Sequence, residues 1–210
     1  GTVDSARIEM RVEPGRLGNG VPLSAQEVSA RFELQGTRFD TAGLIPPVRD
    51  ADGVVEVRGN DFDVSMSSGT VYLPSGRQVV ASNATLVVRS ANVPPVIGKL
   101  EMDVAGNATA VTELASYEPI NAMRHLNMVP DDLSGDVSGH VTADIPFQKT
   151  TDLKTLDWLV ALKFDGLAVA KPFDGQLVTE AVGTITVQPD RAVIDAVGKL
   201  NGIPADIALV

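Results

Sequence analysis

The sequence contains no cysteine, so disulfides, thiolate metal sites and cysteine nucleophiles are all excluded. The lack of cysteine does not fix the cellular compartment, because a periplasmic bacterial protein can dispense with cysteine as readily as a cytosolic one. Aromatic residues make up only 4% of the chain, so its apolar surface consists mainly of Val, Leu, Ile and Ala. Long apolar runs are also missing, and none approaches the roughly 18 residues of a membrane-spanning helix.

Basic residues are scarce relative to acidic ones. The 210 residues include 17 Lys and Arg against 27 Asp and Glu, which gives a net charge of −10. Affinity for nucleic acids comes largely from basic side chains that neutralise phosphates, so we expect no nucleic-acid partner. With 44% hydrophobic and 21% charged residues, the chain nevertheless has the composition of a folded protein.

Candidate catalytic residues are few. The two histidines are His125, in a segment predicted to be helical, and His140, which alternation places with Ser138, Thr142 and Asp144 on the polar face of a strand. A G-x-S-x-G motif, a phosphate-binding glycine-rich loop and an H-E-x-x-H motif are all missing. We therefore predict that the chain is not an enzyme, has no catalytic residues and needs no cofactor.

One short acidic motif matches the beginning of a calcium-binding loop. It is Asp50-Ala51-Asp52-Gly53, but the third acidic ligand and the closing Glu of such a loop are missing. A simple turn explains the motif at least as well. The sequence therefore predicts no metal site.

Alternation of apolar and polar residues dominates the chain and predicts strands with one apolar and one polar face. Turn residues separate these strands, for example at Pro74-Ser75-Gly76, at 188–191 and at the hairpin signal Asn201-Gly202. Short turns of this kind imply antiparallel neighbours. We expect half-buried strands at residues 6–12, 28–35, 54–58, 62–67, 70–73, 78–81, 84–89, 99–104, 136–147, 156–164, 176–180, 183–188, 192–199 and 203–209.

A strand-turn-strand unit occurs twice within this pattern. Val28 and Gly53 of the first copy correspond to Val160 and Gly183 of the second, at separations of 132 and 130 residues. The correspondence keeps its register through the next strand of each copy. Self-similarity of this kind predicts a sheet built by repetition.

The period changes between residues 107 and 133, where apolar residues recur at spacings of three and four. This spacing predicts two short amphipathic helices, with Pro119 in the first turn of the second. The helices would plug one end of the sheet or, alternatively, gate an apolar groove. We expect a first β region at 1–106, the helical insert at 107–133 and a second β region at 134–210, in one continuous domain cut from a longer protein.

The expected fold class is mainly β: a repetitive antiparallel curved sheet, shaped as a groove or a sandwich, with a short two-helix insert. An antiparallel sheet must cover its apolar face with a curled or second sheet, a helix or a ligand. An open groove and a self-filled sandwich show the same alternation, so both remain possible. The residues expected to line the groove are Phe32, Leu34, Val55, Val57, Phe62, Val64, Met66, Trp158, Val160, Leu162, Phe164, Ile185, Val187 and Ile194.

The order of strands, glycines and the helical break resembles the AsmA-like envelope proteins, especially the YhdP branch, with TamB as a more distant relative. The resemblance covers residues 25–210. It rests on Ala30-Arg-Phe-Glu-Leu-Gln-Gly, on the Pro46-Pro47 connection, on Gly53-Val-Val-Glu-Val-Arg-Gly, on Leu133-Ser-Gly-Asp-Val-Ser-Gly and on Val197-Gly-Lys-Leu-Asn-Gly-Ile-Pro-Ala.

The resemblance implies a long β-groove in the periplasm of a Gram-negative bacterium, anchored in the inner membrane by a segment outside this chain. It also implies that the groove conducts phospholipid towards the outer membrane. The expected partners are phospholipid acyl chains, the remaining repeats of the full-length chain and other envelope proteins. The alternative is a structural or protein-interaction scaffold of the envelope with a self-filled interior.

Overall fold

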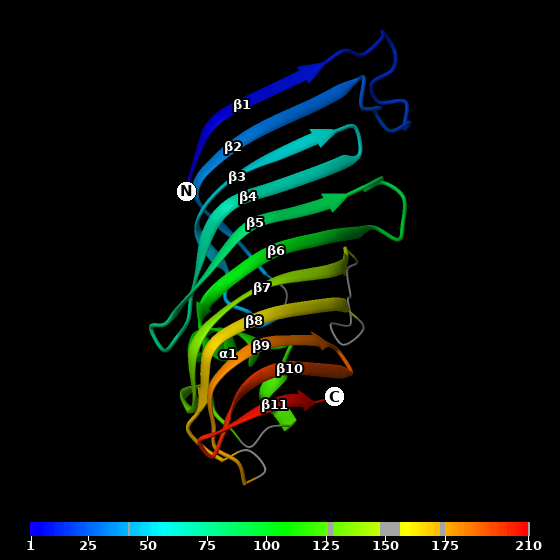
Figure 1. Ribbon diagram of the computed structural model, residues 1–210. Coiled ribbons are helices and arrows are strands. Elements are labelled where there is room, and N and C mark those ends of the chain that lie inside the picture. The colour runs from blue at the N-terminus through cyan, green and yellow to red at the C-terminus, as the bar shows by residue number, and fades with distance from the viewer. Residues whose placement is uncertain (42, 126–127, 148–155, 173–174, 210) are drawn as a thin grey trace.

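The computed structural model describes residues 1–41, 43–125, 128–147, 156–172 and 175–209, except for the side chains of residues 124 and 125. These residues form one antiparallel sheet of eleven strands that lie side by side in sequence order (Figure 1). The strands are β1 (Thr2–Met10), β2 (Val28–Phe39), β3 (Val48–Arg58), β4 (Asp61–Tyr72), β5 (Gln78–Val88), β6 (Ile97–Asn107), β7 (Leu133–Pro146), β8 (Asp157–Val169), β9 (Val178–Gln188), β10 (Arg191–Leu200) and β11 (Ile203–Leu209).

The predicted fold class is confirmed: the chain is mainly β, and its strands are antiparallel. The sheet is open and does not curl round to join its edges, because β1 and β11 each pair with one neighbour only. The two predicted β regions belong to this one sheet, since β6 pairs with β7 across the insert. Within the described ranges no second sheet covers the first.

Several strands are longer than the alternation predicted. The expected strands 62–67 and 70–73 are both part of β4, 78–81 and 84–89 make up β5, and 176–180 and 183–188 make up β9. In each case the pairing register shifts by about one residue inside the strand. A β-bulge inserts an extra residue and so reverses the apolar-polar alternation without ending the strand. The prediction divided each of these strands at its bulge.

Residues with positive φ mark these irregularities. Asp50 in β3, Asn83 in β5 and Glu180 in β9 have φ values of 51°, 50° and 52°. Gly36 in β2 and Gly166 in β8 take the same conformation at register shifts of their own. Bulges bend a strand and increase its twist, and the strands of this sheet bend along their length in Figure 1.

In its described residues, the insert contains one α-helix rather than the two expected. The first expected helix is α1 (Ala108–Ala115), and the second is replaced by the short 3₁₀ helices η1 (Ala122–His125) and η2 (Pro130–Asp132). Pro119 lies in a turn before η1 and not in the first turn of a helix. Proline disfavours helical backbone at the residue before it, and a helix of about ten residues is marginal in water. The apolar spacing was therefore not sufficient to predict a second helix.

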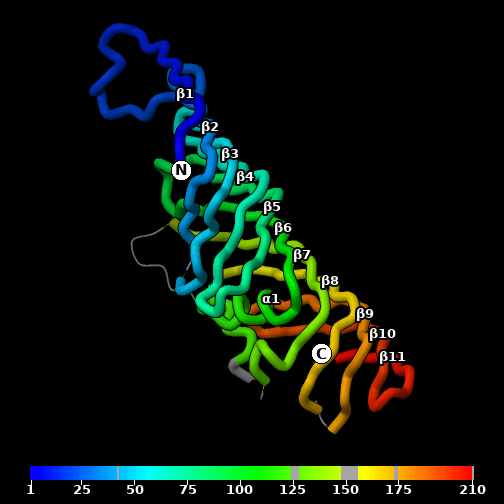
Figure 2. The backbone as a smooth tube through the Cα atoms, turned by 90° about the vertical axis from the view of Figure 1, so that its left-hand side faces the viewer, coloured from blue at the N-terminus to red at the C-terminus, as the bar shows by residue number. Residues whose placement is uncertain are grey.

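The core lies where α1 meets the apolar face of the sheet, on the inner side of the bend (Figure 2). Ala108, Ala110 and Val111 of α1 are buried there. Val79 of β5 is fully buried in the same cluster. The helix therefore covers part of the apolar face and forms a second layer over it.

The bulge in β9 generates the first prediction. Glu180 adopts a left-handed backbone that costs a non-glycine residue about 1 kcal/mol, while its side chain is 68% exposed and pairs only with Lys199. Glu180→Gly should therefore keep or raise the free energy of unfolding, and Glu180→Val should lower it by about 1–2 kcal/mol. Urea denaturation measures both. Glu180→Gln is the control: it removes only the exposed ion pair, and its free energy of unfolding should stay within about 0.5 kcal/mol of the parent's. A Gly variant less stable than the Val variant would contradict the left-handed backbone at residue 180.

Candidate functional site: the apolar face of the sheet

Apolar side chains form ladders that cross the sheet from strand to strand. Residues directly opposite each other in an antiparallel pair point to the same face. One such ladder runs across eight strands through Ala6, Phe32, Val55, Val64, Leu86, Leu100, Ala143 and Trp158. A second continues to the other edge through Val104, Gly139, Leu162, Ile185, Ile194 and Leu209. The sheet thus has one apolar face from end to end.

All fourteen residues predicted to line a groove lie on this face. The ladders contain half of them, and the other half lie two residues along the same strands. Met66 and Phe164 are buried, at 5% and 7% exposure, whereas Phe62 is 38% exposed. The remaining eleven are half-buried. The prediction missed ladder members such as Leu86, Leu100 and Val104, although the alternation at 84–89 and 99–104 already indicated them.

The two copies of the repeat occupy equivalent places on the face. Gly53 in β3 and Gly183 in β9 each lie where a Cβ atom would collide with the neighbouring strand, at the carbonyl groups of Ser65 and Asp195 respectively. Each glycine therefore permits a close approach between strands. The matching glycines show that the repeat in sequence is also a repeat in structure.

The helix α1 covers one part of this face and leaves the rest uncovered. The cluster under α1 contains Met66, Phe164 and Val137, with Leu114 and Tyr117 packed against it. Beyond the helix, Val64 and Trp158 of the first ladder are half-buried, and the ring of Phe147 lies over the face at Gly98, where Val88 is only 7% exposed. The face is accordingly neither a fully filled interior nor a fully open trough.

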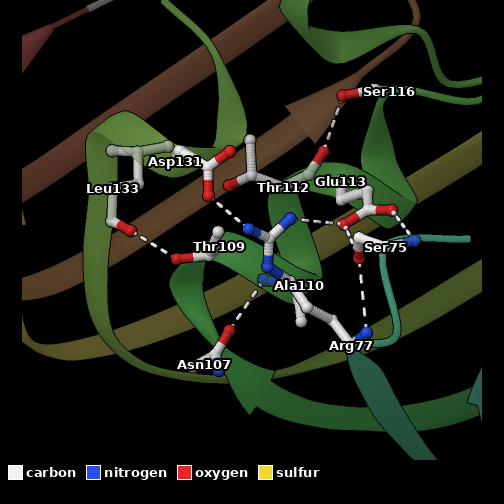
Figure 3. Close-up of polar contacts among 10 residues, drawn as sticks. All are labelled: Ser75, Arg77, Asn107, Thr109, Ala110, Thr112, Glu113, Ser116, Asp131 and Leu133. Carbon is white, nitrogen blue, oxygen red and sulfur yellow. Dashed lines mark hydrogen bonds and ion pairs between the residues drawn. The ribbon is translucent and has the colours of Figure 1, made fainter. Parts of the chain in front are cut away.

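Polar contacts hold α1 in place at its first turn (Figure 3). Asn107 caps the helix, because its Oδ1 accepts a hydrogen bond of 2.7 Å from the backbone N–H of Ala110. The hydroxyl of Thr109 donates to the backbone carbonyl of Leu133, the first residue of β7, at 2.6 Å. An N-cap of this type contributes about 1 kcal/mol to helix stability. The start of α1 is thus fixed to the strands on both sides of it.

An ionic cluster fixes the middle of α1 to the β4–β5 turn (Figure 3). The guanidinium of Arg77 contacts Glu113 at 2.8 Å and also pairs with Asp131, and the hydroxyl of Ser75 donates to Glu113. The Glu113 side chain is only 14% exposed. Burial tends to raise the pKa of this carboxyl, but hydrogen bonds from Ser75 and Arg77 outweigh it and hold the pKa below its ordinary value of 4.5. The sequence analysis did not identify this cluster, because its members are far apart in the chain.

The opposite face of the sheet is polar. His140, as predicted, lies there, and its Nδ1 is 2.8 Å from Oδ1 of Asp103. Hydrogen bonds from Asn83 and His140 hold the pKa of Asp103 below its usual range. All three side chains are close to solvent, and no cluster of metal-ligating residues is found in the described part of the chain. The side chain of His125 lies outside the described residues.

The predicted turn at Asp50-Ala51-Asp52-Gly53 is instead part of β3. Asp50 accepts a hydrogen bond of 2.6 Å from the Tyr72 hydroxyl, and Asp52 accepts one of 2.9 Å from the backbone N–H of Gly36. The two carboxylates therefore support a bulge between strands rather than form a loop. Asp and Gly are residues typical of turns, because they tolerate a positive φ. Here Asp50 has a positive φ at a bulge inside a continuous strand, which explains why the segment was expected to be a turn.

One depression of the surface lies on the polar side of β2–β5 and is lined in part by Arg31, Glu56 and Asp63. Arg31 is already paired with Glu56 and Glu33. The extended apolar face, rather than a depression of this kind, is thus the candidate site, and its chemistry is non-covalent contact with another apolar surface.

No protein-family model, curated protein or solved structure matches the chain. Within the described residues, no helix is long and apolar enough to span a membrane.

The partial cover of the face generates a second prediction. Phe62 and Met66 lie on the same face of β4, but only Met66 is buried. Met66→Asp places a carboxylate without a partner in the core and should lower the free energy of unfolding by about 3–5 kcal/mol. Phe62→Asp keeps its charge hydrated and should cost about 1 kcal/mol. Urea denaturation of both variants checks this, and equal losses would show that α1 does not divide the face.

The ionic cluster generates a third prediction. The lowered pKa of Glu113 contributes stability that is present above its unfolded pKa and is lost as the pH falls through the lower folded value. Glu113→Gln should therefore lose less stability than the parent between about pH 6 and about pH 3. Thermal melts across this range measure the difference. Glu101→Gln, which removes an exposed carboxylate of β6, is the matched control and should follow the parent.

Proposed function

We propose that this chain is a module that binds phospholipid acyl chains on the apolar face of its sheet, as a non-enzymatic part of an AsmA-like envelope protein. In this proposal the module shields or conducts lipid between the inner and outer membranes. The acyl chains lie on the part of the face that α1 leaves uncovered. The polar opposite face stays in water.

One observation carries the proposal: two apolar ladders, from β1 to β8 and from β6 to β11, together cross the whole sheet and extend beyond the helix α1. Two large side chains lie outside the cluster under α1: Phe62, which is 38% exposed, and Trp158, which is half-buried. Contiguous apolar surface of this extent on a soluble protein is typical of an interaction site. An aliphatic lining also suits a ligand without directional contacts.

Magnitudes support a lipid as the occupant. Burial of apolar surface contributes about 25 cal/mol per Å², or roughly 0.8 kcal/mol for each buried CH₂ group. An acyl chain that contacts several strands would therefore gain several kcal/mol while only part of its surface is buried. Because the ladders repeat from strand to strand, neighbouring positions offer similar binding energy. Such a surface favours movement along the sheet over selection of one lipid.

The cellular setting is part of the same proposal. We place the module in the periplasm of a Gram-negative bacterium, joined to the inner membrane through a segment outside this chain. Its further partners are additional repeats of the same protein and other envelope proteins. The support is the resemblance in strand order together with the net charge of −10, which disfavours a nucleic-acid partner.

The second candidate is a structural or protein-interaction scaffold with a filled interior. The observation that favours it is α1, whose Val111, Leu114 and Tyr117 occupy part of the apolar face with the protein's own side chains. A face that were covered in this way along its whole length would have no space for lipid.

Photo-crosslinking tests the proposed function. A photoreactive phenylalanine at Trp158 of β8, on the uncovered part of the apolar face, should crosslink to phospholipid in vesicles or cell extracts. The same group at Lys163 of the same strand, on the polar face, is the matched control and should not crosslink. Mass spectrometry identifies the adducts. Equal crosslinking at the two positions, or none at Trp158 in a folded variant, would exclude the lipid site and favour the scaffold.

A further inference from the structure

Small side chains make the contact between α1 and the sheet. The residues of α1 that are buried against β5, β6 and β7 are Ala108, Ala110 and Val111, at 1%, 0% and 7% exposure. Leu114, the largest apolar side chain of the helix, is only half-buried. The free energy of burial scales with the apolar area removed from water, and an alanine contributes no more than its methyl group. Apolar packing therefore holds this short helix on the face only weakly.

Polar contacts supply the rest of the attachment (Figure 3). Arg77 pairs with Glu113 at 2.8 Å and with Asp131, and Ser75 donates to Glu113. We call Ser75, Arg77, Glu113 and Asp131 the latch. The side chains of Arg77 and Asp131 are 28% and 71% exposed, and ion pairs close to solvent contribute little because water solvates the separated charges. The latch can thus open at a small cost.

We propose that α1 is a displaceable cover of the lipid site: an acyl chain that reaches the cluster under α1 takes the place of the helix, and the latch sets how readily it does so. This inference rests on the proposed binding of acyl chains to the apolar face. Val79 and Ala81 of β5 lie in this cluster at 0% exposure. If α1 moved away in water they would be exposed, whereas an acyl chain in its place keeps them dry.

The covered and the open arrangement differ in their affinity for lipid, so lipid shifts the population towards the open one. A looser latch raises the fraction of open molecules, and the apparent affinity for lipid rises by the same factor. A purely structural role of Arg77 predicts the opposite, since a damaged fold binds lipid less well. The direction of the change in affinity therefore distinguishes a cover from a fixed core.

Hydrogen exchange of the parent chain tests the displacement without any substitution. Vesicles of dioleoyl phosphatidylcholine should accelerate exchange of the backbone amides of α1 by about tenfold or more, because a displaced short helix loses its protection. The amides of β5 should keep theirs, since this strand stays paired with β4 and β6. Acceleration that includes β5 indicates general unfolding and overturns the proposal.

Arg77→Gln tests the latch. In the absence of lipid it should accelerate exchange of α1 by about fivefold. With a photoreactive phenylalanine in place of Trp158, it should lower the vesicle concentration that gives half-maximal crosslinking by a similar factor. Arg38→Gln, which removes an exposed arginine that pairs with Asp40, is the matched control and should change neither quantity. A folded Arg77→Gln chain that needs as much lipid as the parent, or more, overturns the proposal, and if this variant does not fold, exchange in the parent decides.

The displacement and the lipid site itself fail in different ways. No crosslinking at position 158 of the otherwise unchanged chain excludes the lipid site and the displacement together. Crosslinking at that position, with an α1 whose exchange stays unchanged or slows in lipid, overturns the displacement alone. In that case the lipid site stands and α1 is a fixed part of the core.

Discussion

A single antiparallel sheet has two faces, and its stability depends on what removes the apolar one from water. Most domains solve this with a second layer that covers the whole face. Here α1 covers part of the face: it packs over parts of β5, β6 and β7, and its own Val111 and Val79 of β5 are buried in the contact. The sheet therefore combines a packed region around the helix with a half-buried region beyond it. The proposed binding of lipid follows from that second region.

The position of α1 depends on contacts between segments that are distant in the chain. Arg77 on the β4–β5 hairpin reaches Glu113 of the helix and Asp131 of η2, and Thr109 bonds to the first residue of β7. These polar contacts orient a helix of eight residues that would be marginal by itself. They also limit how much of the apolar face the helix can cover.

Alternation in the sequence was sufficient to predict the fold class and the composition of the apolar face. It placed Phe32, Val64 and Leu162 on the same side of the sheet, because a strand directs every second side chain to one face. It failed where the alternation itself is interrupted. At Asn83 and Glu180 a residue with positive φ reverses the pattern, so continuous strands were predicted as two.

The insert shows a different limit of the sequence. Spacing of three and four residues predicted α1 correctly but also predicted a second helix around Pro119, where the chain forms turns and a short 3₁₀ helix. Helical spacing reports which residues share a face and not whether so short a helix is stable. The sequence also could not predict how much of the apolar face the helix covers, because this depends on long-range contacts such as that of Arg77 with Glu113.

The central claim is that the uncovered apolar face binds phospholipid. Native mass spectrometry of the purified chain, after incubation with phospholipid and again after solvent extraction, tests this most directly. The account predicts that the 22.0 kDa chain carries one or more phospholipid masses, which extraction removes and renewed incubation restores. A folded chain that remains free of lipid under all of these conditions would contradict it and leave the apolar face with a structural role.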